Sequence, residues 1–168
     1  MVRITLFRHG KAEPPKDGVA DFDRRLSSRG RINAAQMGLF LAAQDILPNR
    51  ILVSPAARTM ETFEIARQDW PAIEHVICDS LYEANADGLL QLVAKKASNL
   101  RHVMIFGHNP SLVVALNHMV GERHTDRNLS YFPTCCVADV SFAVDRLGEI
   151  KTDEGTLLSM IRVRDLAI

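Results

Sequence analysis

Four short apolar segments, each followed by a helical pattern, constrain the fold of this chain more than any other feature. The predicted strands are residues 2–7, 50–53, 75–78 and 101–106, and two more are predicted at 136–144 and 157–163. The predicted helices are residues 29–44, 87–98, one opening at 55 and one from 110 to about 120. Strands that alternate with helices are typical of an α/β fold. We therefore predict a three-layer α/β/α sandwich with a mainly parallel central sheet, formed by residues 1–168 as a single domain.

Serine and asparagine side chains mark the predicted helix starts. Ser27 or Ser28 is expected to cap the first helix, and Ser54-Pro55 and Asn109-Pro110 each match an N-cap followed by the first helical residue. Within the first helix the apolar residues follow a roughly helical spacing, at Ile32, Ala35, Met37, Leu39, Phe40 and Ala43.

The composition argues against several classes of partner. The formal net charge is zero, so neither a nucleic-acid partner nor a membrane surface is expected. Arginines at positions 3 and 8 interrupt the first apolar run, which is too short for a signal peptide, and no run approaches the roughly 20 apolar residues of a membrane span. The odd set of Cys78, Cys135 and Cys136 favours reduced thiols in a cytoplasmic protein.

Polar and charged residues follow the four apolar strands at the points where the strands end. In parallel sheets, ligands bind outside the carboxyl ends of the strands, so these residues are expected to line one edge. They are Arg8-His9-Gly10, then Ser54 and Arg58, then residues 79–83, and then Gly107-His108.

Two histidines and two arginines at one edge suit a phosphate group. Arginine binds phosphate oxygens with two parallel hydrogen bonds and stays charged. Arg58 falls in the first turn of its predicted helix, where the helix dipole also favours an anion. A neutral histidine can attack phosphorus and form a covalent intermediate, while a second histidine stabilises charge on the transferring group.

These residues lie in segments that resemble the histidine phosphatase superfamily, also called the phosphoglycerate-mutase-like family. Arg8-His9-Gly10 resembles the signature of that family. Four further elements follow in family order over residues 1 to about 120, namely 26–30 (LSSRG), 54–62 (SPAARTMET), 81–83 (LYE) and 107–110 (GHNP). A single Arg-His-Gly is a weak signal, whereas five elements in order are a specific one.

The resemblance implies a role for each matching residue. It makes His9 the nucleophile, Arg8 and Arg58 the phosphate ligands, and His108 the residue that completes the phosphate pocket. Because an attacking histidine must be neutral, activity is expected to fall in acid, near the ordinary histidine pKa of about 6.5.

Two further assignments follow the family pattern less closely. Glu83 matches the position of the proton donor in many members, although small members do not all use it. Arg24 matches an arginine of a frequent Arg-Pro-Leu stretch and is a weaker candidate for substrate binding, because Arg25 stands where proline is common.

The short segments around Glu83 predict no large lid subdomain. A compact layout with an open pocket resembles the SixA-type phosphohistidine phosphatases. This resemblance implies that the substrate is a protein phosphohistidine, such as that of a phosphorelay or phosphotransfer protein. Two alternatives stay open at this point: a phosphatase of small phosphate esters, and a phosphate-binding module without catalysis. Residues 121–133 are either a partner-contact loop or a plain surface loop.

No metal or other cofactor is expected. The chain has neither a His-Glu-x-x-His nor a Cys-x-x-Cys pattern, and it lacks the glycine-rich loop of P-loop enzymes.

Overall fold

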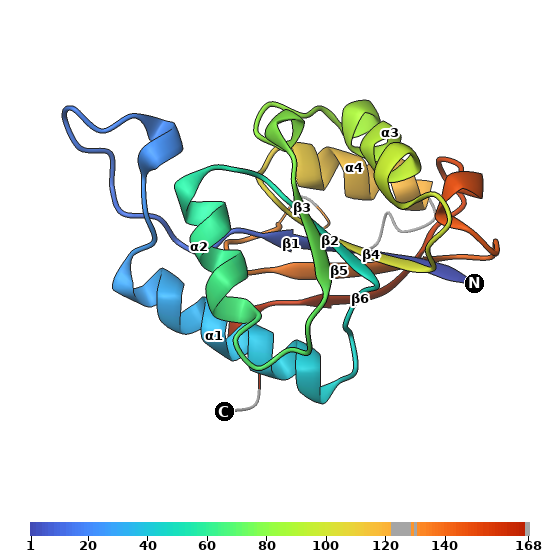
Figure 1. The fold of residues 1–168 in the computed structure, drawn as a ribbon, viewed down its shortest axis with the longest axis horizontal. Coiled ribbons are helices and arrows are strands. Elements are labelled where there is room, and N and C mark those ends of the chain that lie inside the picture. The colour runs from blue at the N-terminus through green and yellow to red at the C-terminus, as the bar shows by residue number, and fades with distance from the viewer. Residues whose placement is uncertain (122–128, 130, 167–168) are drawn as a thin grey trace.

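A computed structural model describes residues 1–121, 129 and 131–166 of the chain (Figure 1). The strands are β1 (Val2–Arg8), β2 (Arg50–Val53), β3 (Glu74–Ile77), β4 (His102–Gly107), β5 (Val137–Phe142) and β6 (Thr156–Ile161). The helices are α1 (Ser28–Ala43), α2 (Ala57–Ala66), α3 (Ala86–Ala97) and α4 (Ser111–Val120). The predicted order of strands and helices is confirmed, with boundaries shifted by one or two residues in most elements.

The six strands form one sheet in the order β3-β2-β4-β1-β5-β6. Strand β4 pairs in parallel with both β1 and β2, β2 pairs in parallel with β3, and β5 and β6 run antiparallel at the other side. The predicted mainly parallel sheet is therefore confirmed. Because Arg8 stands opposite Gly107 in the β1–β4 register, the two histidines that follow these residues leave the sheet side by side.

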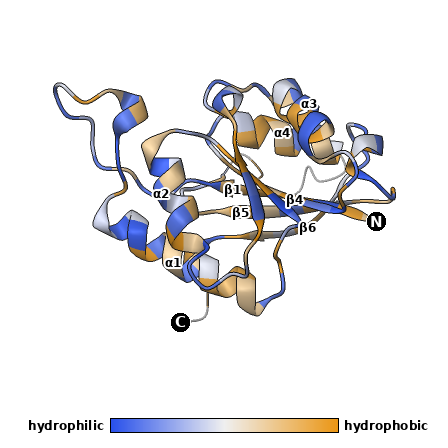
Figure 2. Cartoon of the chain, in the orientation of Figure 1, coloured by the Kyte–Doolittle hydropathy of each residue, from blue (hydrophilic) through white to orange (hydrophobic). Residues whose placement is uncertain are grey.

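Helices cover both faces of the sheet and divide the core in two. One cluster of buried residues joins the sheet to α3 and α4, and the other joins it to α1 and α2. In Figure 2, hydrophilic and hydrophobic colours alternate along α1 and α3, as expected of helices with one face on a core and the other in solvent. This arrangement is the predicted α/β/α sandwich.

The apolar residues of α1 do not all lie on its buried face. Ile32 and Leu39 are 59% and 54% exposed, whereas Gly38 is among the buried residues. A Cβ atom on Gly38 would lie 2.1 Å from the carbonyl oxygen of Ala66 at the end of α2. The helix therefore buries the side that lets it approach α2 closely, and small size outweighs hydrophobicity in choosing that side.

Two of the three predicted helix starts are wrong. Ser27 caps α1 as predicted, accepting a hydrogen bond from the Gly30 amide. Helix α2 instead begins at Ala57 without a side-chain cap, because the Ser54 hydroxyl bonds a histidine. Helix α4 begins at Ser111, and the Asn109 amide group donates to the Phe132 carbonyl. In both places, the polar residue serves the edge of the sheet and not the helix.

A buried polar network lies inside the sheet. The hydroxyl of Thr5 on β1 lies 2.8 Å from Nε2 of His102 on β4 and 2.9 Å from a carboxylate oxygen of Asp139 on β5. Arg3 pairs with the same carboxylate, and Nδ1 of His102 donates to the Leu47 carbonyl. The network ties together the three central strands that support the polar edge.

The three cysteine thiols are buried and free. Cys135 packs in the α1–α2 cluster and Cys136 in the α3–α4 cluster, so the adjacent side chains face opposite sides of the sheet. Burial raises the pKa of both thiols to about 12, which keeps them protonated. Within the described ranges, no helix has both the length and the apolar character required to cross a membrane.

Candidate active site

His9 leaves the end of β1 with its orientation fixed by one hydrogen bond. Its Nδ1 lies 2.7 Å from the carbonyl oxygen of Gly10, and the ring is 9% exposed. A carbonyl can only accept a hydrogen bond, so Nδ1 carries the proton. In the neutral ring, Nε2 then bears a free lone pair, which is the form that a nucleophile requires.

Gly10 is needed at this position for space. The φ angle of Gly10 is not positive, so its backbone conformation does not require glycine. A Cβ atom would, however, lie 2.9 Å from the carbonyl oxygen of Gly30 at the start of α1. The Gly10 amide donates to the Thr62 hydroxyl, which in turn donates to the Arg58 carbonyl. The turn after His9 is thereby anchored to α2, the helix that carries Arg58.

His108 follows β4 and faces His9. The two ring centroids are 5.1 Å apart. Nε2 of His108 lies 2.7 Å from the Ser54 hydroxyl and 3.2 Å from the Thr59 hydroxyl, so two residues around the start of α2 hold the ring. Its Nδ1 is buried and has no partner among the described residues.

Arg58 is buried in the first turn of α2 and is held by a carboxylate. One of its terminal nitrogens donates to the Asp21 carboxylate at 2.9 Å, and the other donates to the Asp21 carbonyl. The same carboxylate accepts from Arg24 at 2.8 Å and from the Tyr82 hydroxyl at 3.1 Å. These bonds tie the loop of residues 11–25 to the site, although most of that loop is exposed.

Arg8 approaches the site from the other side. It is the last residue of β1, and its terminal nitrogen donates to the Phe132 carbonyl at 2.7 Å. Its Nε is buried without a partner in the described part of the chain. Arg8 therefore keeps a free donor near the two histidines.

Burial keeps both histidines neutral. Loss of water lowers the pKa of His9 to about 3, and the neighbouring charges of His108, Arg58 and Arg8 act in the same direction. Burial followed by the charge of Arg58 lowers the pKa of His108 to about 4. Because the site lowers the pKa of His9 well below its ordinary value, protonation of His9 in the free protein is expected at a pH well below 6.5.

The structure brings four of the six predicted residues together. The rings of His9 and His108 lie 5.1 Å apart, and the charges of Arg8 and Arg58 act on both. Arg24 binds the Glu13 carbonyl and Asp21, so it touches the site only through the loop of residues 11–25.

Glu83 follows Tyr82, which contacts Asp21 and His108. Glu83 itself is exposed in the turn before α3, and its carboxylate makes no hydrogen bond or ion pair within the described ranges. Much of the segment 121–133, for which a contact role was considered, lies outside the described residues. In the part of the chain that is described, no three His, Cys, Asp or Glu side chains are grouped to bind a metal ion.

Sequence reasoning missed Asp21, Tyr82 and Thr59. The strong hydrogen bond from Arg24, together with the bonds from Arg58 and Tyr82, lowers the pKa of the Asp21 carboxyl group to about 2. Asp21 sits in a polar loop with no periodic pattern, so only its contact with Arg58 reveals its place. Thr59 lies one position after Arg58 in the segment of residues 54–62, and its role as a support for His108 depends on the β2–β4 pairing.

Comparison with known proteins places this site in a defined family. The model of the histidine phosphatase superfamily (branch 1) matches residues 4–89, just over half of the chain. The uncharacterized protein MT1313 of Mycobacterium tuberculosis is 29% identical over 136 residues, which cover 78% of this chain and 84% of that protein.

Two solved structures resemble the whole chain. A protein provisionally named phosphohistidine phosphatase SixA, from Agrobacterium tumefaciens, is 29% identical with a TM-score of 0.84, covering 96% of this chain and 97% of its own. The protein histidine phosphatase SixA complexed with tungstate shares the fold, with a TM-score of 0.76 at 20% identity, and the match covers 99% of this chain and 100% of that chain.

Proposed function

Because the chain belongs to the histidine phosphatase superfamily, we propose that it is a phosphatase that transfers phosphate to His9 and then to water. The observation that carries this proposal is the bond between His9 Nδ1 and the Gly10 carbonyl. It leaves Nε2 bare on a largely buried histidine, whose ring lies 5.1 Å from that of His108 and is influenced by the charges of Arg8 and Arg58. A module that only bound phosphate would have no use for a nitrogen held in this reactive form.

The geometry suits a two-step reaction. In the first step, Nε2 of His9 attacks phosphorus, a new N–P bond forms, and the bond from phosphorus to the leaving group breaks. In the second step, water attacks the phosphorus, the His9 N–P bond breaks, and inorganic phosphate leaves. The guanidinium groups of Arg8 and Arg58 oppose the charge on the phosphoryl oxygens throughout.

His108 is proposed to stabilise the transferring phosphoryl group. Its buried Nδ1 lacks a partner in the described chain, and an unsatisfied buried nitrogen favours an incoming hydrogen-bond partner. The negative charge of a bound phosphate would raise the pKa of His108 above its value of about 4 in the empty pocket. Ligand binding thus creates the protonated form that stabilises the phosphoryl oxygens.

The proposed substrate is a protein phosphohistidine. The phosphohistidine N–P bond breaks readily once the leaving imidazole takes up a proton, so a built-in acid is less important than for an ester. The structure fits this condition: the lowered pKa of Asp21 favours its ionised form, and Glu83 is exposed and makes no hydrogen bond or ion pair among the described residues. Both the role of Glu83 as proton donor and that of Arg24 in substrate binding stay predictions.

Steady-state turnover of two substrate classes tests the proposal. The enzyme should hydrolyse a histidine-phosphorylated protein with a kcat/KM well above that for small phosphomonoesters. His9→Ala should abolish turnover of both substrates. If the protein only bound phosphate, the same substitution would remove no activity, because there would be none to remove. Faster turnover of the small esters would support the alternative of a small-molecule phosphatase instead.

A rapid-quench experiment tests the intermediate. Mixing with labelled substrate should give acid-labile label on the wild-type protein and none on His9→Ala. Glu83→Gln should reduce the formation of this intermediate from phosphomonoesters more than from phosphohistidine if Glu83 supplies the proton.

A further inference from the structure

A cleft lined by cationic side chains adjoins the candidate active site through Arg8. It is a cleft of about 530 Å³ between the start of α1, residues 131–134 and the segment that follows β6. Its lining includes Arg8, Lys11, Arg29, Tyr131, Arg162 and Arg164. Because Arg8 belongs to both the cleft and the phosphate site, a molecule bound in the cleft would touch the edge of the pocket that holds His9.

The positive charge of this cleft is largely unbalanced. The side chains of Lys11 and Arg29 make no hydrogen bond or ion pair with the described residues. Arg162 and Arg164 share one carboxylate, that of Asp165, at 3.7 Å and 3.5 Å. The first turn of α1 carries Arg29 and no acidic residue, although the helix dipole disfavours a cation there. A bound anion would offset the excess positive charge of the cleft, and it would also offset the unfavourable position of Arg29 in the first turn of α1.

Two guanidinium groups in the cleft wall have unused donors. The Nε atoms of Arg8 and Arg162 are buried, and neither has a partner in the described ranges. Buried N–H groups without acceptors cost free energy, so these two favour a ligand rich in acceptor oxygens.

Tyr131 adds an aromatic surface at the mouth of the cleft. Its ring is 48% exposed and has the guanidinium carbons of Arg162 and Arg164 each 5.5 Å from its centroid. Exposed tyrosine and arginine are the residue types most enriched in protein–protein contacts. The aromatic contact also holds two cations in one place without neutralising them.

The cleft is built onto the end of the catalytic strand. The Cys135 amide lies 3.1 Å from both the Arg8 and His9 carbonyls, and Arg8 donates to the Phe132 carbonyl. On the opposite wall, the short helix at 163–165 packs against α1 (Figure 1). Both walls of the cleft are therefore fixed relative to His9.

From these observations we propose that the cleft docks an acidic segment of the phosphoprotein substrate, with aspartate or glutamate side chains placed beside the phosphohistidine. This inference rests on the proposed function and adds to it a rule for substrate choice. The exposed rim of Lys11, Arg29 and Arg164 can meet several carboxylates at once, which suits a protein surface with several acidic side chains.

A matched set of histidine-phosphorylated peptides tests the docking. One peptide carries aspartate and glutamate around the phosphohistidine, the second carries asparagine and glutamine at the same positions, and the third carries lysine. Wild-type kcat/KM should be highest for the acidic peptide, and this preference should shrink as salt rises from about 0.05 to about 0.5 M, because salt screens exposed charges.

The charge-reversal variant R29E/R164E gives the complementary measurement. It should lower kcat/KM for the acidic peptide by about tenfold relative to a small phosphate ester, and it should turn the preference toward the lysine peptide. A preference that follows the enzyme's charge in this way cannot result from a general loss of folding.

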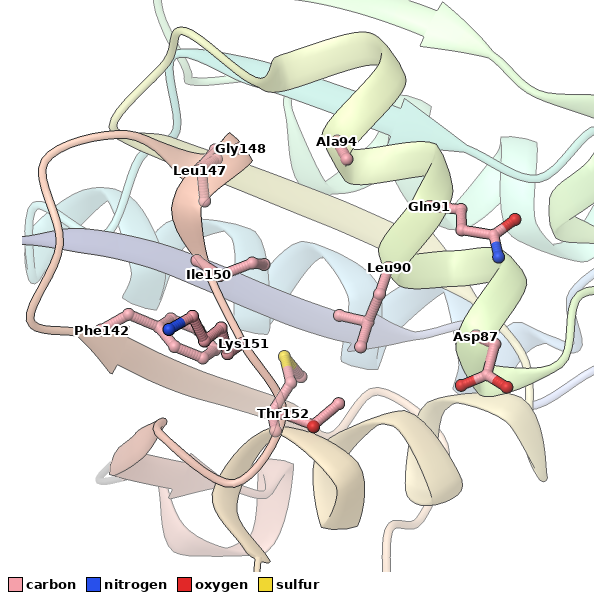
Figure 3. Close-up of a pocket in the computed structure, with 11 residues that line it drawn as sticks. Asp87, Leu90, Gln91, Ala94, Phe142, Leu147, Gly148, Ile150, Lys151 and Thr152 are labelled. Carbon is pink, nitrogen blue, oxygen red and sulfur yellow. The ribbon is translucent and has the colours of Figure 1, made fainter.

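Lys151 supplies the matched control. It lines a separate hollow of about 310 Å³ between α3 and the end of β5, together with Leu90 and Phe142 (Figure 3). Phe142 pairs with Val2 at the opposite end of β1 from Arg8, about 20 Å away at the rise of a strand. Lys151→Glu should therefore leave the peptide preference unchanged.

Failure of the docking proposal can be distinguished from failure of the proposed substrate. Equal wild-type turnover of the acidic and amide peptides, or an equal effect of K151E and R29E/R164E, would overturn the docking proposal alone. Absence of turnover of every phosphohistidine peptide, with rapid hydrolysis of a small ester, would overturn the proposed substrate and the docking with it.

Discussion

At the scale of single residues, the chemistry depends on which form His9 adopts. The Gly10 carbonyl selects the tautomer, and burial selects the neutral ring. Neither influence can be recognised in the letters Arg-His-Gly, which identify the nucleophile but not its protonation. The consequence appears in the dependence of activity on pH.

The pH profile of kcat/KM should not show a histidine limb near pH 6.5. A lowered pKa keeps His9 neutral as the pH falls, so the free enzyme should lose its nucleophile only near a pH of about 3. The acid limb of the kcat profile should lie at a higher pH than that of kcat/KM, because bound phosphate also raises the pKa of His9. Substrates whose phosphate groups ionise at different pH values separate ionisation of the substrate from that of the enzyme. A kcat/KM limb at pH 6.5 with every substrate would contradict the buried neutral histidine.

If Arg58 binds phosphate as proposed, Asp21 competes with the phosphate for its guanidinium. Replacing it with asparagine removes a negative charge and keeps an acceptor for the guanidinium, so Asp21→Asn should lower KM and the inhibition constant of tungstate by several-fold. Asp23→Asn changes the same charge in the same loop and is the control. A rise in KM with unchanged kcat would instead make Asp21 a residue that positions Arg58.

At the scale of the elements, the alternation of strands and helices was enough to predict the sheet. Strand ends at His9 and His108 were predicted to meet, and the parallel pairing of β1 with β4 brings them together. The starts of α2 and α4 were not predictable, since Ser54 and Asn109 have contacts with residues more than 20 positions away. A cap pattern in the sequence describes only local hydrogen bonds, whereas Ser54 and Asn109 bond residues that are distant in the sequence.

The contact between α1 and α2 gives a stability prediction. Gly38→Ala should destabilise the protein by about 1–3 kcal/mol, because a methyl group would overlap the Ala66 carbonyl. This cost exceeds the gain of about 1 kcal/mol that alanine brings to a helix interior. Denaturant unfolding measures the difference, and Ile32→Ala on the exposed side of α1 should change it little. Equal stability of G38A and wild type would show that the helices can separate without cost.

At the scale of the whole molecule, three buried neutral histidines link folding to pH. Burial lowers the pKa to about 3 for His9 and to about 4 for His102 and His108. The unfolded chain takes up these protons at about pH 6.5, so the stabilising contribution is complete above that pH and is lost as the pH falls toward 4.

The free energy of unfolding, measured in urea at several pH values, should therefore decrease from pH 7 to pH 4. Each histidine adds up to about 1.4 kcal/mol per pH unit to the slope within that window. Inorganic phosphate favours the charged forms of His9 and His108, so it should reduce their contribution to the slope of unfolding free energy against pH. The contribution of His102 should be unchanged. A stability that is constant over this range would contradict burial of the three rings.

The order of the strands has a consequence for how the chain matures during synthesis. Strands β1 and β2 are not neighbours, because β4 lies between them and pairs with both. All residues from His9 to the end of α2 are translated before β4, the strand that joins β1 to β2. The centre of the sheet therefore closes only after residue 107 has left the ribosome, and a nascent chain halted earlier exposes two unpaired strand edges. Catalytic competence should appear late, in a single step, as β4 inserts.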